Sequence, residues 1–429
     1  MNIHAPQSLE AEAELRELSS TKNHIISAAA SKPNIAIVQD ALLGAYKMTY
    51  GFDPIRKDQF YQVLMHIDRF DFSSLNKRIQ HIRKVLKQKG KKAQCFNGKG
   101  IVSMIFPLDF CYERKNNAHP TEDTLKIYKG VVYEGTLDKT VLGSSANAIS
   151  QVLFKEYGID TAMNFINNIQ FIANQWILIR GFSVGLGDCL IQGAEKEDEI
   201  SKAVEKYMME AEVIKTTTKN ERIREVRVKA ALNKAKDVGM KIAKDALEPT
   251  NNFVSTIKSG SKGDTYNVCC VTGLLSQQNI MGGRVEKCLN HNKRTLPHYP
   301  FSEMPMALEY ESRGFVRSSF IKGLNPREFF FHAISGREGV CSTAMGTAQS
   351  GYMQRRIVKL TEDIKTMYDG TIRDTTGRIY QFAFGENGID PIMTVNIKGN
   401  QEICDVSRLV DNLNMNFEDE LKQNAKYNM

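Results

Sequence analysis

One aromatic and three basic side chains lie close together in the stretch GREGVCSTAMGTAQSGYMQRRIVK, residues 336–359. Tyr352 offers a ring, and Arg355, Arg356 and Lys359 follow it within two turns of a helix. Guanidinium and ammonium groups bind phosphates, and an aromatic ring can stack on a base. If the stretch is helical, this spacing favours contact with nucleic acid.

Small residues precede this basic segment, and in a helix they need a physical reason. Four of them are glycines, namely Gly336, Gly339, Gly346 and Gly351. Each glycine costs about 1 kcal/mol relative to alanine in a helix interior. Two explanations stay open: another backbone packs closely against the small residues, or a base pair lies against Thr347 and Ala348. Glycines would also let the helix bend locally.

A capping pattern upstream predicts where this helix begins. In GLNPREFFFHAI, Asn325 is a good N-cap, Pro326 suits the first helical position, and Glu328 can complete a capping box. Apolar residues continue at helical spacing, at Ile357, Leu360, Ile364 and Met367. Gly370 is a natural stop. We expect one helix over about 325–369, on the order of 60 Å long, that crosses a space between two masses.

The remaining patterns predict a mainly helical chain with some β structure. We expect helices over 8–31 and 145–181, a short strand at 35–38, strands at 101–107 and 125–137 with a Lys-Gly turn at 129–130, and two charged helices over 194–247 joined near 216–219. The mixed charges of the last pair favour a solvated helical hairpin over a nucleic-acid contact. The expected fold is α+β, mainly α, in several domains: a β-containing N-terminal half, the helical hairpin and the long helix.

Composition and charge restrict the class of protein. The 429 residues suffice for two to four domains. A net charge of +8 favours acidic partners, most simply nucleic acid, although 49 acidic residues make this only a bias. Eight cysteines without CxxC pairs indicate reduced thiols in a cytosolic or nuclear setting. The N-terminus lacks a signal-peptide pattern, and no apolar run approaches about 18 residues, so we expect neither secretion nor a membrane span.

Two further motifs predict no additional chemistry. The glycine-rich segment SGSKGDTYN, residues 259–267, contains a lysine, but it lacks the P-loop pattern and follows a helix. A zinc site could be imagined from Cys269, Cys270, Cys288, His291 and His298. Adjacent cysteines and irregular spacing match no usual structural zinc site, so zinc is not expected.

The helix sequence resembles that of a known family. GLNPREFFFHAISGREG and TAQSGYMQRRIVKLTEDI are similar to the bridge helix of the largest subunit of multisubunit DNA-directed RNA polymerases of the eukaryotic, archaeal and large-DNA-virus type. Further segments resemble the same subunit in the same order, namely MNIHAPQS, IAIVQDALLGAYKMT, VLGSS, GFSVGLGDCLI, SGSKGDTYNV, LLSQQNIMGGR, KRTLPHYP and SRGFVRSSFIKGL. The resemblance implies the end of the active-site domain at 1–50, a pore domain at 51–190, a funnel at 191–300 and the start of the cleft domain at 301–429.

The resemblance also implies roles for individual residues. Thr347 and Ala348 would lie beside the templating base pair. Gly351, Tyr352, Arg355, Arg356 and Lys359 would follow the template strand and its phosphates. Three residues would lie under the bridge helix or near the channel through which nucleotides enter, namely Gln277, Gln278 and Lys262. An equally acceptable explanation of the two glutamines is that they cap a local turn.

Departures from the family limit what this chain is expected to do. The family binds Mg²⁺ through the aspartates of an NADFDGD loop, which this chain lacks. Its mobile trigger loop is also missing. We therefore expect a segment that is not competent alone, from a split gene, a gene interrupted by an intron or intein, or a fragment. A partner segment would hold Mg²⁺.

The resemblance implies a set of partners and leaves one alternative function. The partners would be the upstream metal-loop piece, the downstream trigger-loop piece, the second-largest subunit, template DNA, RNA and nucleoside triphosphates, with no membrane. Ser335, Gly346 and the Cys269-Cys270 pair depart from the family and indicate a diverged lineage. Because a broken largest-subunit gene is less expected in a cellular nucleus, we expect a large DNA virus, with action in the host cytoplasm or virion; a cellular protein would act in the nucleus. The alternative is a non-catalytic nucleic-acid-binding scaffold, or a degenerate paralogue, associated with polymerase.

Overall fold

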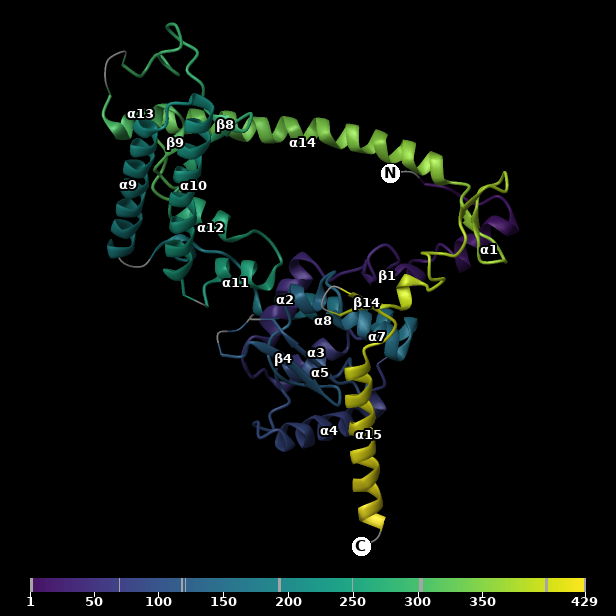
Figure 1. Ribbon diagram of the computed structural model, residues 1–429. Coiled ribbons are helices and arrows are strands. Elements are labelled where there is room, and N and C mark those ends of the chain that lie inside the picture. The colour runs from purple at the N-terminus through teal and green to yellow at the C-terminus, as the bar shows by residue number, and fades with distance from the viewer. Residues whose placement is uncertain are drawn as a thin grey trace. The chain divides into compact units, whose positions relative to one another are not determined.

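A computed structural model describes residues 3–68, 70–116, 119, 121–191, 194–248, 250–300, 304–397 and 400–427 (Figure 1). Met1 and Asn2 of the MNIHAPQS segment lie outside these ranges. The chain divides into a first unit of Met1–Phe182, Lys258–Lys262 and Ile364–Met429, and a second unit of Ser183–Ile257 and Gly263–Asp363. The expected fold class is confirmed, because the chain is 54% helical with small antiparallel sheets.

The first unit combines helices with short antiparallel strands. Its elements are α1 (Leu9–Glu17), η1 (Thr21–His24), β1 (Ile26–Ser27), β2 (Lys32–Pro33), α2 (Gln39–Thr49), α3 (Lys57–Leu64), η2 (Phe72–Ser74), α4 (Leu75–Gln88), α5 (Gly98–Ser103), β3 (Tyr112–Lys115), β4 (Thr124–Tyr128), β5 (Val131–Glu134), α6 (Lys139–Leu142), α7 (Ile149–Tyr157), α8 (Ile159–Arg180), β10 (Lys365–Thr366), β11 (Ile372–Arg373), β12 (Ile379–Gln381), η4 (Pro391–Met393), β13 (Val395–Ile397), β14 (Asn400–Glu402) and α15 (Val406–Tyr427).

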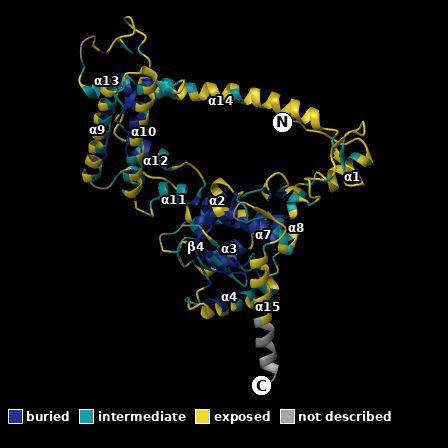
Figure 2. Ribbon diagram, viewed as in Figure 1, coloured by how far each residue is buried: buried dark blue, intermediate teal, exposed yellow. Residues whose placement is uncertain are grey.

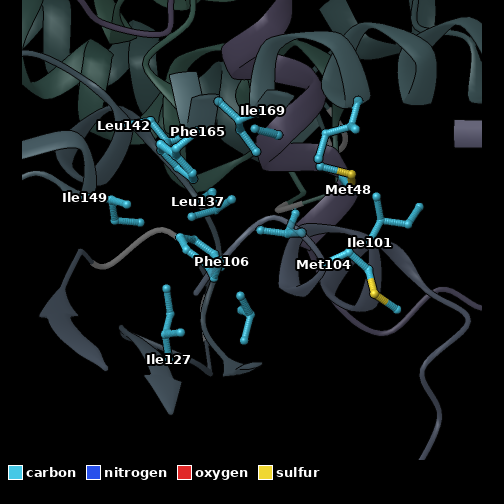
Figure 3. Close-up of a cluster of buried hydrophobic side chains, with 14 of the residues drawn as sticks. Met48, Ile101, Met104, Phe106, Ile127, Leu137, Leu142, Ile149, Phe165 and Ile169 are labelled. Atoms are coloured by element: carbon cyan, nitrogen blue, oxygen red, sulfur yellow. The ribbon is translucent and has the colours of Figure 1, made fainter. Parts of the chain in front are cut away.

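A single hydrophobic core holds most of the first unit together. Figure 3 shows part of it, where Ile127 of β4, Phe165 of α8 and Phe106 from the segment after α5 lie close together. Helices α2 and α8 pack backbone to backbone, since a Cβ on Gly44 would lie 2.4 Å from the carbonyl oxygen of Ala173. Glycine is therefore required where these two helices meet.

Sequence patterns predicted some elements of this unit and missed others. The hairpin expected at 125–137 is confirmed as β4 and β5, with positive φ at Lys129 and Gly130 in the turn. The strand expected at 101–107 is wrong, because this segment begins with the helix α5, capped by Asn97. A short buried apolar run is compatible with both a strand and a buried helical turn, so the sequence pattern alone does not distinguish them.

The N-terminal predictions also need correction. The helix expected over 8–31 ends at Glu17, and Ile26–Ser27 pairs with Lys32–Pro33 as a small hairpin. The strand expected at 35–38 is absent; this described segment pairs with no strand, and Ile37 N donates to the Leu142 carbonyl at 3.2 Å. The helix expected over 145–181 is two helices, broken at Gly158, where φ is +88°.

The second unit contains the longest helices of the chain. Its elements are η3 (Leu186–Cys189), α9 (Ala194–Thr217), α10 (Glu221–Asp245), α11 (Asn252–Ser259, which ends in the first unit), α12 (Thr265–Thr272), β6 (Ser276–Gln277), β7 (Asn279–Ile280), β8 (Gly283–Arg284), α13 (Met306–Ser312), β9 (Phe315–Val316) and α14 (Pro326–Thr361). The expected helical hairpin is confirmed as α9 and α10, which lie side by side (Figure 1). A buried seam joins them, formed by Val204, Met208, Ala211, Val228, Ala231, Leu232 and Ala235.

Helix α14 begins where the capping pattern predicts. Asn325 Oδ1 accepts from Glu328 N at 2.8 Å, and the Glu328 carboxylate accepts from Asn325 N at 3.1 Å. The helix is 36 residues long, about 54 Å at 1.5 Å per residue. Among the described ranges, no helix is long and apolar enough to cross a membrane.

The predicted end of this helix, near residue 369, is wrong. The helix ends at Thr361, and Lys365–Thr366 pairs with Ile372–Arg373 as an antiparallel hairpin. The Asp369 side chain accepts from Thr371 N at 3.0 Å, and Met367 N donates to the Thr371 carbonyl at 2.8 Å. Turn chemistry around Asp369 and Gly370 therefore overrides the apolar spacing that predicted a longer helix.

Candidate nucleic-acid interface

The first turns of α14 are fixed in the second unit. Phe331 is buried, and its ring stacks near that of Tyr299 with centroids 6.3 Å apart. Besides capping the helix, the buried Glu328 carboxylate accepts from Arg317 N at 3.2 Å and Ser318 Oγ at 2.9 Å. Several hydrogen bonds to a buried carboxylate hold this end of the helix in one position.

Three polar residues of α14 continue this anchorage on one face. Gln278 Oε1 lies 3.1 Å from His332 Nδ1, and Ser335 Oγ donates to the Asn279 carbonyl at 3.0 Å. Met281 N donates to the Glu338 carboxylate at 2.9 Å. His332, Ser335 and Glu338 are spaced i, i+3, i+6, so they face the same way. The helix is therefore supported by the segment 278–281 as far as Glu338.

The rest of α14 lacks such support from the residues that the structure describes. Residues 339–361 are exposed except Gly346, which is half-buried (Figure 2). Beyond the adjoining helix backbone, Cβ atoms added at Gly336, Gly339, Gly346 or Gly351 would have no described atom within 4 Å. Close packing against another helix of this chain therefore does not explain these glycines in the described part of the structure.

The small residues make a smooth surface as well as an exposed one. The hydroxyls of Thr343 and Thr347 donate to the carbonyls of Gly339 and Thr343, at 2.9 and 2.8 Å. Ser350 Oγ donates to the Gly346 carbonyl in the same way. These polar groups turn back onto the helix. What Thr347 and Ala348 present outward is therefore mostly methyl groups.

All seven residues predicted to contact nucleic acid lie on this exposed part of α14. At 3.6 residues per turn they fall on about half of the circumference of the helix. They are Thr347, Ala348, Gly351, Tyr352, Arg355, Arg356 and Lys359. The opposite face presents the exposed apolar side chains of Met353, Ile357 and Leu360. One helix therefore brings the predicted contact residues together and separates them from an apolar stripe.

The charge of this face is positive. Residues 339–361 contain no Asp or Glu. Lys359 Nζ pairs with Glu362 Oε1 at 2.5 Å, just beyond the helix. The Arg356 guanidinium lies 5.6 Å from the centre of the Tyr352 ring, which is 65% exposed. This arrangement leaves Arg355 and Arg356 directed at solvent, and it can attract an anionic strand to the helix.

Gln277 and Gln278 are both buried beside the first half of α14. Gln277 Nε2 donates to the carbonyls of Gln278 and Arg313, at 2.7 and 2.8 Å. Gln278 Nε2 donates to the carbonyl of Ser276 at 3.2 Å. Both amides therefore cap local backbone, while Gln278 also reaches His332. The two glutamines therefore cap nearby backbone groups, and Gln278 also supports α14.

Lys262 lies in a different unit from the other predicted site residues. It is exposed and lines a cavity of about 580 Å³ with Lys139, Ser144 and Ser145 of the first unit. Gly260 is required there, because its φ is +75° and a Cβ would lie 2.5 Å from Cβ of Lys139. The cavity combines two lysines with serine hydroxyls, which suits an anion.

The described residues supply no metal centre. No three of their His, Cys, Asp or Glu side chains converge on a common point. Cys269 and Cys270 are buried in α12, whereas Cys288 is exposed, and all three are free thiols. These residues do not fit a Mg²⁺ site of three carboxylates, so no chemical step is derived through a metal on this part of the chain.

Sequence reasoning missed His332, Ser335 and Glu338. Their i, i+3, i+6 spacing marks a polar face, and that signal was available in the sequence. Their partners, however, lie more than 50 positions upstream in residues 278–281. Only the tertiary structure identifies that segment as the support.

Comparison with known proteins places the described elements in a family context. RNA polymerase Rpb1 domain 3 matches residues 24–189, domain 4 matches 204–316 and domain 5 matches 323–411. Helices α9 and α10 thus lie mainly in the domain 4 match, and α14 lies in the domain 5 match.

Two viral proteins are similar to nearly the whole chain. The "Probable DNA-directed RNA polymerase II subunit RPB1 homolog" of Invertebrate iridescent virus 6 is 46% identical over 446 residues, covering 98% of this chain and 42% of that protein. Protein 008R of Frog virus 3 (isolate Goorha), described as a DNA-directed RNA polymerase, is 34% identical over 394 residues, covering 91% of this chain and 28% of that protein. The chain spans less than half the length of either relative.

Proposed function

Because this chain belongs to the RNA polymerase Rpb1 family and is a segment of a largest subunit with domains 3, 4 and 5, we propose that α14 serves as the bridge helix in template-dependent RNA synthesis. The observation that carries this proposal is the exposed part of α14. It has small residues in the middle and basic residues along one side, and the space around its glycines holds no described atom beyond the adjoining helix backbone. RNA synthesis belongs to the whole assembly, of which this chain supplies one part.

The proposed role follows from the two parts of the helix. The anchored part, up to Glu338, fixes the direction of the axis. The longer exposed part, residues 339–361, then offers Thr347 and Ala348 as a surface against which a base pair can lie without steric conflict. Arg355 and Arg356 would bind template phosphates one to two turns further on. We assign three tasks to these residues: they bind the template, orient the base pair, and keep bulky side chains out of the space that the base pair occupies.

The finer assignments are also proposals. We assign residues 1–50 to the end of the active-site domain, 51–190 to the pore, 191–300 to the funnel and 301–429 to the start of the cleft domain. Gln277, Gln278 and Lys262 would shape the path of incoming nucleoside triphosphates. A partner segment would hold Mg²⁺, and the second-largest subunit and a trigger-loop segment would complete the enzyme. The two viral relatives support an origin in a large DNA virus, with action in the host cytoplasm or virion.

Copurification tests this function directly. The chain, tagged and isolated from its native source, should bring down the segment with the metal-binding loop, together with template-dependent incorporation of ribonucleotides. A control tag on an unrelated protein should recover no such activity. If an intact largest subunit accounts for all RNA synthesis and this chain is dispensable, the chain is instead a non-catalytic scaffold.

Arg356→Ala should weaken template binding and change its salt dependence. Each lost phosphate contact lowers the slope of log K against log [salt] by about 0.9 for duplex and about 0.7 for single strands. The measurement is template affinity of the assembled polymerase across a salt series. Arg222→Ala, on the exposed side of α10, removes the same charge and should leave the slope unchanged. An unchanged slope for Arg356→Ala would remove this residue from the phosphate contacts.

A further inference from the structure

The most strongly charged surface of the chain lies on α4, far in sequence from α14. Residues 75–92, LNKRIQHIRKVLKQKGKK, contain eight Lys and Arg residues and no Asp or Glu. The net charge of the whole chain is +8. The remainder of the chain is thus formally balanced, and this segment of the first unit accounts for the entire excess.

The core fixes which side of α4 faces outward. Its apolar residues are buried in the core of the first unit, namely Ile79, Ile82, Val85 and Leu86. At helical spacing, Lys77, Arg83, Lys84 and Lys87 fall on the other side, and all four are exposed. We call these four residues, with Lys91 and Lys92 in the following loop, the α4 basic face. Its orientation is set by burial of the apolar side and does not depend on a ligand.

Other basic residues of this segment are already used within the unit. Arg78 Nη1 donates to the Met104 carbonyl at 2.5 Å; burial lowers the pKa of its guanidinium, and Asp71 opposes this shift. His81 Nε2 lies 2.9 Å from the Lys129 carbonyl. The Lys89 ammonium lies 3.9 Å from the centre of the Tyr128 ring. The first contact attaches α4 to the segment after α5, and the other two attach α4 and its loop to the β4–β5 hairpin.

The lysines of the α4 basic face have no such use. Among the described residues, no carboxylate pairs with Lys77, Lys84, Lys87, Lys91 or Lys92. By contrast, the charged helices α9 and α10 mix both signs, and Lys234 pairs with Glu210 at 3.0 Å. A solvated face normally mixes both signs. An unpaired face of one sign instead attracts a polyanion.

We propose that the α4 basic face binds the phosphate backbone of duplex DNA without sequence preference. Lys77 and Lys84 are about 10 Å apart along the axis, a length over which duplex DNA carries about six charges. Single strands are held by exposed aromatic rings as well as by cations. No residue of the α4 basic face is aromatic, and two nearby rings are covered by cations: Lys89 lies over Tyr128, and Arg83 of the face lies 5.8 Å from the centre of the Phe96 ring. This contact goes beyond the role proposed for α14 and lies in the other unit.

The test uses the full 429-residue chain and a fluorescent duplex of arbitrary sequence, about three helical turns long. We expect Lys77→Gln/Lys84→Gln/Lys87→Gln to weaken binding on the order of tenfold at low salt and to lower the slope of log K against log [salt] by about 2.7, three times 0.9. Lys77→Arg/Lys84→Arg/Lys87→Arg should bind as the parent does. Circular dichroism checks that the variants are folded.

A matched control separates the α4 basic face from net charge. Lys202→Gln/Lys241→Gln/Lys244→Gln removes the same charge from exposed positions of α9 and α10. Equal loss of DNA binding in both triple variants would overturn the proposal. So would an equal loss of binding to single-stranded RNA of the same length, or to polyglutamate, because the face would then recognise any polyanion or an acidic protein. Loss confined to the α4 variant and to duplex DNA supports it, whatever the outcome for α14.

Discussion

Ala348→Phe should slow RNA chain elongation by roughly 100-fold in a reconstituted polymerase while leaving assembly nearly intact. The helix is exposed at this position, so the larger side chain would project outward from α14. If a base pair lies there, the ring displaces it from the reactive geometry. A displacement of about 1 Å is enough to reduce the rate of a positioned reaction by about 100-fold.

Stability should change little in the same variant. Exposed substitutions away from caps and cores usually alter the free energy of unfolding by no more than about 0.5 kcal/mol. Gly351→Leu adds bulk on the same face and should stabilise the helix by about 1 kcal/mol, because glycine is unfavourable in a helix interior; beyond the adjoining helix backbone, no described atom lies within 4 Å of the added Cβ. Both variants should therefore copurify with partner segments at near-normal yield. The measurement pairs elongation rate on a defined template with the yield of assembled complex.

Met353→Phe provides the matched control, because Met353 lies on the apolar stripe opposite the contact face and is 59% exposed. It introduces the same phenyl ring outside the proposed site, so elongation should be retained. If Ala348→Phe and Gly351→Leu reduce assembly as much as elongation, the small residues serve packing against a partner chain. The bridge-helix role of these residues would then fail.

Local sequence signals predicted the start of α14 and not its end. The Asn325 and Glu328 cap needs only residues three positions apart, so it could be predicted directly. The end depends on a hairpin that Asp369 and Gly370 nucleate, and this competed with an apolar stripe of helical spacing. Periodicity could not decide between the two, because the residues beyond Thr361 satisfy both patterns.

The candidate site divides in the same way. Its basic face and its smooth centre could be predicted, because both are properties of one helix with known spacing. The anchorage at Glu338 could not, because the backbone of Met281 supplies its partner. The same holds for α5, where Ile101 and Val102 are buried by neighbours that local pattern does not specify. Residue types identify a chemistry, whereas packing decides which elements support it.

Lys99→Met should lower the free energy of unfolding of the first unit by about 3 kcal/mol. Lys99 is 2% exposed, and its ammonium pairs with Glu122 Oε2 at 2.8 Å and lies 4.3 Å from the centre of the Phe52 ring. Removing one partner of a buried ion pair leaves an uncompensated charge and costs about 3 to 5 kcal/mol. The lower figure applies because the Glu122 side chain keeps 14% of its exposure.

The loss should depend on pH with a defined sign. Burial alone would raise the pKa of Glu122, but hydrogen bonds from Lys99 Nζ and Gly135 N outweigh it and hold the pKa below its ordinary value. Stability from this carboxylate is therefore complete above the ordinary glutamate pKa and is lost as pH falls through the lowered value. Without Lys99, Glu122 can take up a proton as the pH falls, and the protonated side chain no longer carries a buried, unpaired charge. The difference between parent and variant should thus be larger at about pH 7 than at about pH 4.

Urea unfolding followed by tryptophan fluorescence measures this effect in one unit alone. The chain has a single tryptophan, Trp176, which is buried in the same core as α5. Lys99→Met/Glu122→Gln removes the stranded charge while keeping an acceptor for Gly135 N, so it should recover much of the loss at neutral pH. If the single and double variants are equally unstable at both pH values, the loss arises from how the substituted side chain packs and not from the buried charge of Glu122.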